Sequence, residues 1–352
     1  MKRFFLVPIL FFTAFSFYQC DQPDDPIEDK FDWRNSLIGS EKPLSEANEP
    51  ECVGPPLIDF EAPYDPELLR AAHFDSLGFI ASVRMSTTRP EFVKYRCYYP
   101  TYKSDGSFHG FEVISYLKNL KTNNRIKLRN EKGAHYGDFG GQYLYFERNV
   151  NEVRHLYLLD CESLDEIEIA SNSEAQSISP NGILLSYYNY GQRQTIVYNT
   201  ITKKNEIAEE HIYGWFDDST FLGSKNGVYY RKKYFGEDST FLSSKSFGSS
   251  PLYISPNNKY IANNNNLFIL DIDKDIHFSL PDEKIREETW CWNKGLWNFS
   301  FLPDNTIISG KYLYYPNYNT MEAKLTYQMR LISGPDYQTE TYIELNLETE
   351  RL

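Results

Sequence analysis

From about residue 75 onward, short apolar runs alternate with polar turn residues. The runs are rich in Tyr, Phe, Ile, Leu and Val, and they are separated at short intervals by Gly, Asn, Asp and Pro. No long stretch keeps the 3.6-residue apolar period of an amphipathic helix. Short β-rich runs between turn residues are typical of strands joined by tight turns. The pattern therefore predicts an all-β chain.

One unit of this pattern recurs along the chain. Ser-Pro-Asn-Gly at 179–182 precedes apolar runs at 183–187 and 195–199, and Ser-Pro-Asn-Asn at 255–258 precedes runs at 259–262 and 267–271. A degenerate copy, Leu-Pro-Asp-Asn, lies at 302–305. We expect each unit to be a turn, an inner strand, a hairpin and an outer strand, with Asn-Gly or Asn-Asn supplying positive φ.

The spacing of the two clear copies indicates further copies. Pro180 and Pro256 lie 76 residues apart, about twice the ~40 residues of a single propeller repeat. The segment beginning at Trp215 occupies the gap, and two weaker copies lie upstream, at 138–160 and 111–124. Repeats at this period indicate a repeat architecture rather than a single sheet.

The turn followed by an apolar strand and Leu-Phe-Ile-Leu-Asp resembles the PD40 (WD40-like) repeat of TolB-type β-propellers. The resemblance implies four-stranded antiparallel blades around a central channel, over residues 74–352. We expect six blades, while five or seven stay open. A two-sheet sandwich also fits the strands, but it gives no reason for the periodic turns.

The N-terminus predicts export. Lys2 and Arg3 precede an uncharged run at 4–18, which is shorter than the roughly 20 residues of a membrane span. With Cys20 following, residues 1–19 resemble a bacterial lipoprotein signal peptide, which implies acylation of Cys20 and a place in the cell envelope. We expect an outer-membrane lipoprotein that faces the periplasm or the surface. Cleavage after Ser16, giving a secreted soluble protein, is the alternative.

The negative charge is concentrated next to this signal. The chain has 36 Lys and Arg against 49 Asp and Glu, a net charge of -13. Residues 21–70 hold 14 acidic and 4 basic residues and 8 of the 18 prolines, so we expect residues 20–73 to form an extended tether. An acidic chain without a basic cluster argues against nucleic-acid binding.

The sequence shows no catalytic or metal-binding motif. Nucleophile elbows, zincin and C-x-x-C motifs, P-loops and dinucleotide fingerprints are absent, and the six His residues have no ligand spacing. We therefore expect no cofactor, no metal and no catalytic residue that the sequence can name. Asp217 and Asp218 are adjacent, so on a strand they would point to opposite faces. We expect them, with Asn181, Asn257 and Asp304, to form turns.

Aromatic residues are the candidates for ligand binding. Trp can stack on sugar faces or fill the space between blades, and both interpretations are open for the Trp residues that we single out, Trp215, Trp290, Trp292 and Trp297. Ser76, Ser219 and Ser239 lie in Asp-Ser segments that resemble the acceptor triads of Bacteroidota O-glycosylation.

The remaining cysteines can be buried free thiols or form disulfides that the sequence cannot rank. They are Cys52, Cys97, Cys161 and Cys291.

Taken together, these features favour an envelope-anchored, non-catalytic β-propeller that binds a protein, peptide or glycan through the loops at the channel mouth. The alternative is a glycan-active hydrolase or lyase whose acidic and aromatic residues meet only in the folded chain. The sequence favours the binding protein and leaves catalysis open.

Overall fold

The computed structural model describes residues 31–44, 78–128, 135–225, 228–234, 236, 238–243, 252–263, 268–279, 292–317 and 322–351. The chain divides into two units, Met1–Asp32 and Trp33–Leu352, and every described helix and strand belongs to the second. No helix among the described residues is long and apolar enough to cross a membrane.

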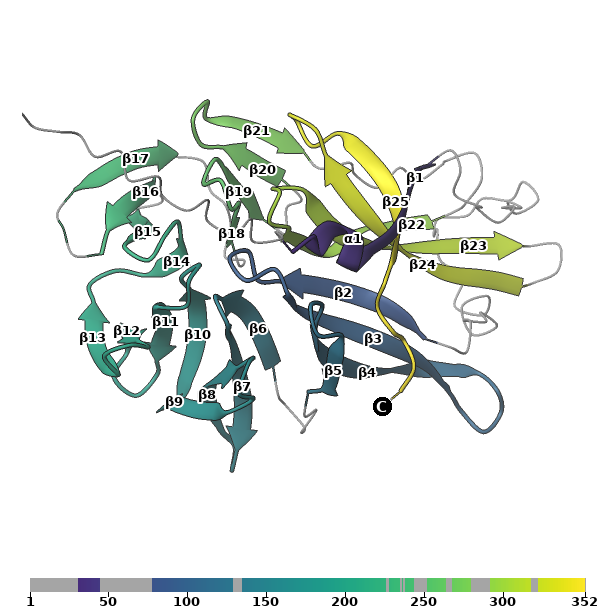
Figure 1. Cartoon of the computed structure of the whole chain (residues 1–352), viewed down its shortest axis with the longest axis horizontal. Helices are drawn as coiled ribbons and strands as arrows, with labels where there is room; N and C mark the ends of the chain where they lie inside the picture. Colours follow the sequence, from purple (N-terminus) through teal and green to yellow (C-terminus); the bar gives the residue numbers. More distant parts are fainter. Residues whose placement is uncertain are drawn as a thin grey trace, which may run out of the picture. The chain divides into compact units, whose positions relative to one another are not determined.

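The described strands form six antiparallel sheets, which are the blades of a propeller (Figure 1). Each contains four consecutive strands, and one of them also has a fifth strand from the N-terminal end of the unit. Blade 1 comprises β2 (Phe79–Met85), β3 (Phe92–Tyr102), β4 (Phe108–Asn119) and β5 (Asn124–Lys127). Blade 2 comprises β6 (His135–Gly140), β7 (Tyr143–Val150), β8 (Val153–Asp160) and β9 (Glu166–Ser171). Blade 3 comprises β10 (Ser173–Ile178), β11 (Leu184–Asn189), β12 (Gln194–Asn199) and β13 (Lys204–Ala208).

The second half of the ring repeats this plan. Blade 4 comprises β14 (Ile212–Trp215), β15 (Thr220–Lys225), β16 (Val228–Lys233) and β17 (Ser239–Ser243). Blade 5 comprises β18 (Leu252–Ile254), β19 (Tyr260–Asn263), β20 (Phe268–Asp271) and β21 (Ile276–Ser279). Blade 6 comprises β22 (Trp292–Phe301), β23 (Ile307–Asn317), β24 (Glu322–Ser333) and β25 (Thr339–Leu345).

The first strand of each blade is the innermost one. Each of these six strands contacts the first strand of the next blade, and β22 contacts β2, so the described inner strands close a ring. The predicted all-β, six-bladed, four-stranded architecture is confirmed, as are the repeat copies that we assigned to the gap and upstream.

One detail of the predicted repeat is wrong. The strand that follows Ser-Pro-Asn-Gly, β11, is the second strand of its blade, and the innermost strand β10 precedes the turn. The Asn and Gly residues do supply positive φ, with values of 76° at Gly182, 60° at Asn258 and 67° at Asn305. The turns therefore lie at the rim of the channel, immediately after the strands that line it.

Apolar side chains between neighbouring blades make the core. In strand β12 the central residues are buried and the two end residues are not. Residues on both sides of the strand are buried because both faces of a blade pack against other blades. Five buried clusters among the described residues each join two consecutive blades, from blades 1 and 2 to blades 5 and 6. Burying one large apolar side chain stabilises the fold by about 1.5–3 kcal/mol.

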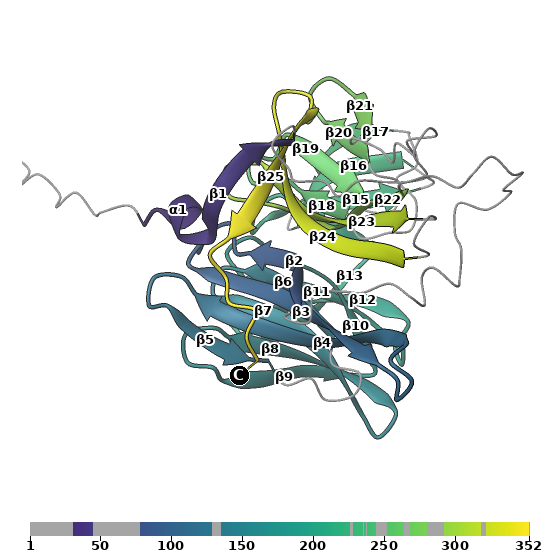
Figure 2. The ribbon, with the colours of Figure 1, turned by 90° about the vertical axis from the view of Figure 1, so that its right-hand side faces the viewer.

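The seam between blades 6 and 1 is closed by the two ends of the second unit. The helix α1 (Trp33–Leu37) leads into β1 (Ile38–Pro43), which pairs antiparallel with β25 at the outer edge of blade 6. After β25 the chain crosses to blade 1, where the Tyr95 hydroxyl donates to the Glu348 carbonyl over 3.1 Å. Figure 2 shows β1 beside β25 and the C-terminal segment passing along blade 1.

The predicted tether therefore needs a correction at its centre. Residues 33–44 fall within 20–73, where we expected an extended, solvated chain, yet they contain α1 and β1 and belong to the propeller unit. Strand β1 is extended and largely exposed, so composition alone could not separate it from a spacer. The backbone of β25 provides its partner. Residues 20–30 and 45–73 lie outside the described residues.

Candidate functional site

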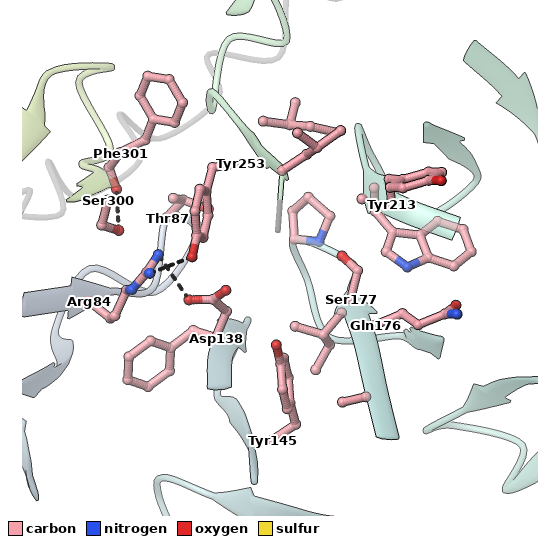
Figure 3. A pocket seen from close by; sticks show the side chains of 18 of the residues that line it. Arg84, Thr87, Asp138, Tyr145, Gln176, Ser177, Tyr213, Tyr253, Ser300 and Phe301 are labelled. Atoms are coloured by element: carbon pink, nitrogen blue, oxygen red, sulfur yellow. Dashed lines mark hydrogen bonds and ion pairs between the residues drawn. The ribbon is translucent and has the colours of Figure 1, made fainter. Parts of the chain in front are cut away.

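A cavity of about 210 Å³ lies at the end of the channel where the inner strands lead into the turns. All six inner strands contribute side chains to it, and Thr87 and Pro180 of the turns lie at its edge. Figure 3 shows these side chains converging from separate blades. The volume can hold several water molecules and is below the ~300–1,000 Å³ of sites that enclose a drug-sized ligand. A single ring or a chain end fits it better.

Arg84 of β2 lies in the wall of the cavity and joins three blades. Its Nη1 lies 3.3 Å from Oδ1 of Asp138 in blade 2, and its Nη2 donates to the Tyr253 hydroxyl of blade 5 over 2.7 Å. The guanidinium also lies over the Tyr253 ring, 4.3 Å from its centroid. Burial opposes the charge, but Asp138 and Tyr253 outweigh it and raise the pKa of Arg84. Arg84 is therefore a fixed cation in the cavity wall (Figure 3).

The opposite wall carries buried polar atoms without partners. Trp215 is 4% exposed, and neither its Nε1 nor Oε1 of Gln176 has a hydrogen-bond partner among the described residues. The other amide atom of Gln176, Nε2, donates to Nδ1 of His211 over 2.7 Å. Burial lowers the pKa of His211, which favours the neutral ring that accepts this bond. Trp215 and Gln176 both line the cavity, so two of its lining residues each carry a buried polar atom without a described partner.

Tyr145 completes the wall between these two sides. It comes from β7 and its ring packs on the backbone of Gly137, where a Cβ atom would lie 1.8 Å from the ring. Burial and the nearby carboxylate of Asp138 raise the pKa of Tyr145 well above its ordinary value. The phenol is therefore neutral and can donate or accept a hydrogen bond.

Among the Trp candidates, Trp215 belongs to the buried cluster between blades 3 and 4 and also lines the cavity. Trp292 and Trp297 belong to the innermost strand of blade 6, but their side chains are outside the description, and Trp290 is outside the described residues. Cys20 and Ser76 also lie outside them. Ser219 is exposed in a turn and Ser239 is exposed on β17, so the acceptor role of these two serines stays a prediction.

The expected turn carboxylates form turns. Oδ1 of Asp217 accepts from both the backbone N and the hydroxyl of Ser219, each over 2.7 Å. Burial opposes ionisation, but these bonds outweigh it and lower the pKa of Asp217. Asp218 accepts from the backbone N and the Nδ2 of Asn181, at 3.2 and 2.6 Å. Asp218 therefore connects blade 4 to blade 3.

Arg84, Asp138, Gln176 and Tyr253 were not among the sequence candidates. They come from four different blades, so no local motif joins them. The sequence does contain one indication of Arg84, since it is the one charged residue in the otherwise uncharged strand β2.

Cys97 and Cys161 are buried free thiols. Burial raises the pKa of Cys97 to about 11 and raises that of Cys161 further. Cys52 and Cys291 lie outside the described residues. Within the described part of the chain, no group of three His, Cys, Asp or Glu side chains could hold a metal ion.

No protein-family model matches the chain, and no curated protein matches it either. Solved structures do match. TolB from Acinetobacter baumannii shares 11% identity at a TM-score of 0.42, covering 78% of this chain and 80% of TolB. The β-propeller domain of the Trilobed protease from Pyrococcus furiosus shares 15% at 0.38, covering 77% and 94%. Oligogalacturonate lyase in complex with manganese shares 12% at 0.40, covering 77% and 91%.

Proposed function

We propose that this protein is an envelope-anchored, non-catalytic β-propeller that binds a protein, peptide or glycan at the mouth of its channel. The observation that carries the proposal is the pair of buried, unpartnered polar atoms, Trp215 Nε1 and Gln176 Oε1, in the wall of the cavity. Leaving a buried polar group unsatisfied costs about 1–3 kcal/mol. A ligand that accepts from Trp215 and donates to Gln176 would remove both costs.

The composition of the wall supports a ligand with both polar and apolar surface. Phenol and indole rings from blades 2, 4 and 5 stand beside an arginine, a carboxylate and an amide. Aromatic rings with a polar end suit peptides and sugars, because they contact apolar faces while their polar atoms form hydrogen bonds.

An enzymatic role as a glycan hydrolase or lyase is less well supported by this site. Glycosidase chemistry needs two carboxyl groups about 5–10 Å apart. Among the described residues that line the cavity, Asp138 is the one carboxylate, and it is paired with Arg84.

The proposal is tested by presenting the full-length chain to peptide and glycan arrays and titrating each retained probe. Trp215→Phe keeps an aromatic ring and removes the Nε1 donor, so we expect about tenfold weaker binding. Trp33→Phe, in α1 at the outer edge of blade 6, is the matched control and should bind like the wild type.

Two results would overturn the proposal. One is an array that retains no probe although the near-UV circular dichroism spectrum shows that the protein is folded. The other is equal affinity of the two Trp variants for every retained probe. Gln176→Leu is the second variant, needed because Trp215→Phe removes volume from the core; it should weaken binding without opening a space there.

A further inference from the structure

Three basic side chains share one face of blade 1 beside the channel. In the antiparallel pairing of β2 with β3, Arg84 lies opposite Lys94 and Ser82 lies opposite Arg96. Directly opposite residues project to the same face of a sheet, and so do residues two apart on one strand. Arg84, Lys94 and Arg96 therefore form one surface, which we call the cationic wall.

The cationic wall faces the inner strand of blade 2. Lys94 is 3% exposed and its Nζ donates to the backbone carbonyl of Gly137, while Arg84 pairs with Asp138 of the same strand. Elsewhere this interface is apolar, with Phe92 and Leu117 of blade 1 in one cluster with residues of blade 2. The interface is therefore apolar at the periphery and basic beside the channel.

Among the described residues, the negative charge opposite the cationic wall is smaller than the positive charge of its two arginines. Of the described groups that act electrostatically on Arg84, Lys94 and Arg96, Asp138 is the one carboxylate; the others are tyrosines and the basic residues themselves. Asp138 is already held by Arg84. The side chain of Arg96 forms no hydrogen bond or ion pair with any other residue that the structure describes.

Burial and mutual repulsion lower the pKa of two of these groups. Burial, together with the charges of Arg96 and Arg84, lowers the pKa of Lys94 well below its ordinary value. Burial and Arg84 likewise lower the pKa of Arg96. Removing one partner of a buried charge is costly because it leaves the other uncompensated, so a bound anion would stabilise this wall.

Arg96 lies beside the cavity that the proposed function uses. It lies diagonally across the β2–β3 pairing from Arg84, which lines the cavity. Its side chain is partly exposed. A group bound beside Arg84 is therefore close to a guanidinium that has no partner among the described residues.

We infer that the ligand presents a carboxylate to the channel, held by Arg96 beside Arg84. This inference rests on the proposed function and names the chemistry of the ligand. A guanidinium binds a carboxylate through two parallel N–H···O bonds, and the small cavity beside it suits one ring or one residue. The carboxylate can come from a sugar acid or from the C-terminus of a peptide, and the experiment below separates the two.

The test measures thermal unfolding of the full-length chain in low salt with two matched pairs of probes. The first pair is glucuronate and glucose, and the second is N-acetylalanine and its amide. We expect the acid of one pair to raise Tm while its neutral partner does not, and the pair that responds identifies the source. Added salt should reduce the effect, because screening weakens charge-assisted binding.

Variants of Arg96 assign the effect to the cationic wall. Arg96→Gln should weaken binding of the acid about tenfold or more, Arg96→Lys should retain part of it, and Arg193→Gln, in an exposed turn of blade 3, should match the wild type. Without a probe, Arg96→Gln should unfold at the same or a higher temperature in low salt, since it removes a repelling charge. A lower Tm there would assign Arg96 a structural role and count against the inference.

Other outcomes separate this inference from the proposed function. If the neutral partner binds as tightly as the acid, or if Arg96→Gln binds the acid like the wild type, the inference fails. The same holds if neither acid stabilises the protein at millimolar concentration. A neutral array ligand that is sensitive to Trp215→Phe would leave the proposed function intact in each of these cases.

Discussion

At the scale of single residues, the absence of a side chain at Gly182 allows two turns of neighbouring blades to approach each other closely. Gly182 has a φ of 76°, and a Cβ atom there would lie 2.2 Å from the carbonyl oxygen of Gly140 in the neighbouring blade. Positive φ costs a residue with a side chain about 1–2 kcal/mol. The contact adds a second cost, because the backbone of Gly140 cannot move aside as a flexible side chain would.

We therefore expect Gly182→Ala to lower the free energy of unfolding by about 3 kcal/mol, in the upper range of point substitutions. Gly106→Ala is the control, because Gly106 has a φ of 82° with nothing within 4 Å of the added atom. That control should cost only the ~1–2 kcal/mol of the backbone conformation. Guanidinium denaturation of both variants measures the difference, and equal losses would show that the approach of the two blades is not rigid.

The same scale shows why the turns were predictable and the cavity was not. Asn-Gly at 181–182 and Asn258 produce positive φ through local chemistry alone. Four adjacent residues are therefore enough to recognise these turns. Arg84 and Tyr253 belong to strands that are 169 positions apart and meet only across the channel. The local sequence of neither segment indicates this contact, apart from the one charged residue in the apolar strand β2.

At the scale of elements, the segment after β25 acts as a clasp on blade 1. Lys118 of β4 is 4% exposed, and its Nζ donates to both carboxylate oxygens of Glu348, at 2.7 and 2.9 Å. The Tyr99 hydroxyl donates to the carbonyl of Thr349 over 2.7 Å. Burial opposes ionisation of Glu348, but the bonds from Lys118 outweigh it and lower the pKa of its carboxyl group.

The lowered pKa of Glu348 makes the clasp dependent on pH. A carboxyl whose pKa is lower in the folded state adds stability above its unfolded pKa, about 4.3 for Glu, and loses it as the pH falls through the folded value. We expect Glu348→Gln to lower Tm at pH 7. The loss corresponds to about 1 kcal/mol, a discounted figure because the Glu348 side chain is 43% exposed.

The difference in Tm should shrink as the pH falls below about 4.3 and vanish under more acidic conditions. Scanning calorimetry of the wild type and Glu348→Gln across this range checks it. Glu350→Gln, a nearby exposed position, should unfold like the wild type throughout. A difference in Tm for Glu348→Gln that stays constant down to the most acidic pH would contradict the linkage.

At the scale of elements, the sequence could predict some strands and not others. The two strands that follow each clear turn were predicted because each is an apolar run of several residues. Strand β18 has three residues and β1 is mostly exposed, so neither carries an apolar period long enough to recognise. Their positions follow from hydrogen bonds to a neighbouring strand, which the local sequence does not encode.

At the scale of the whole molecule, the repeat predicted the number of blades because each blade cannot bury its faces alone. The position of the chain in the cell rests on the N-terminal segment, which is outside the described residues and stays a prediction. If residues 1–19 are a lipoprotein signal, Cys20 is the attachment point of the acyl chains.

Palmitate labelling of the full-length chain in a Gram-negative host tests this prediction. We expect the wild type and Cys52→Ser to incorporate label and to sediment with membranes, and Cys20→Ser to do neither. Globomycin, which blocks the lipoprotein signal peptidase, should leave the wild type unprocessed. Equal labelling of Cys20→Ser would contradict lipidation at Cys20 and leave secretion as the predicted location. The ligand-binding part of the proposal would be unaffected.

The pairing of β1 with β25 sets the order in which the propeller can be completed. Glu41 accepts a hydrogen bond from Thr341, 300 positions later. At synthesis rates of about 5–20 residues per second, that partner emerges roughly 15–60 s after β1. During this interval the residues of β1 have no pairing partner, and an unpaired strand edge is the kind of surface on which chains associate wrongly. Its charged and polar residues, Ser40 to Lys42, suit a strand that must wait for its partner.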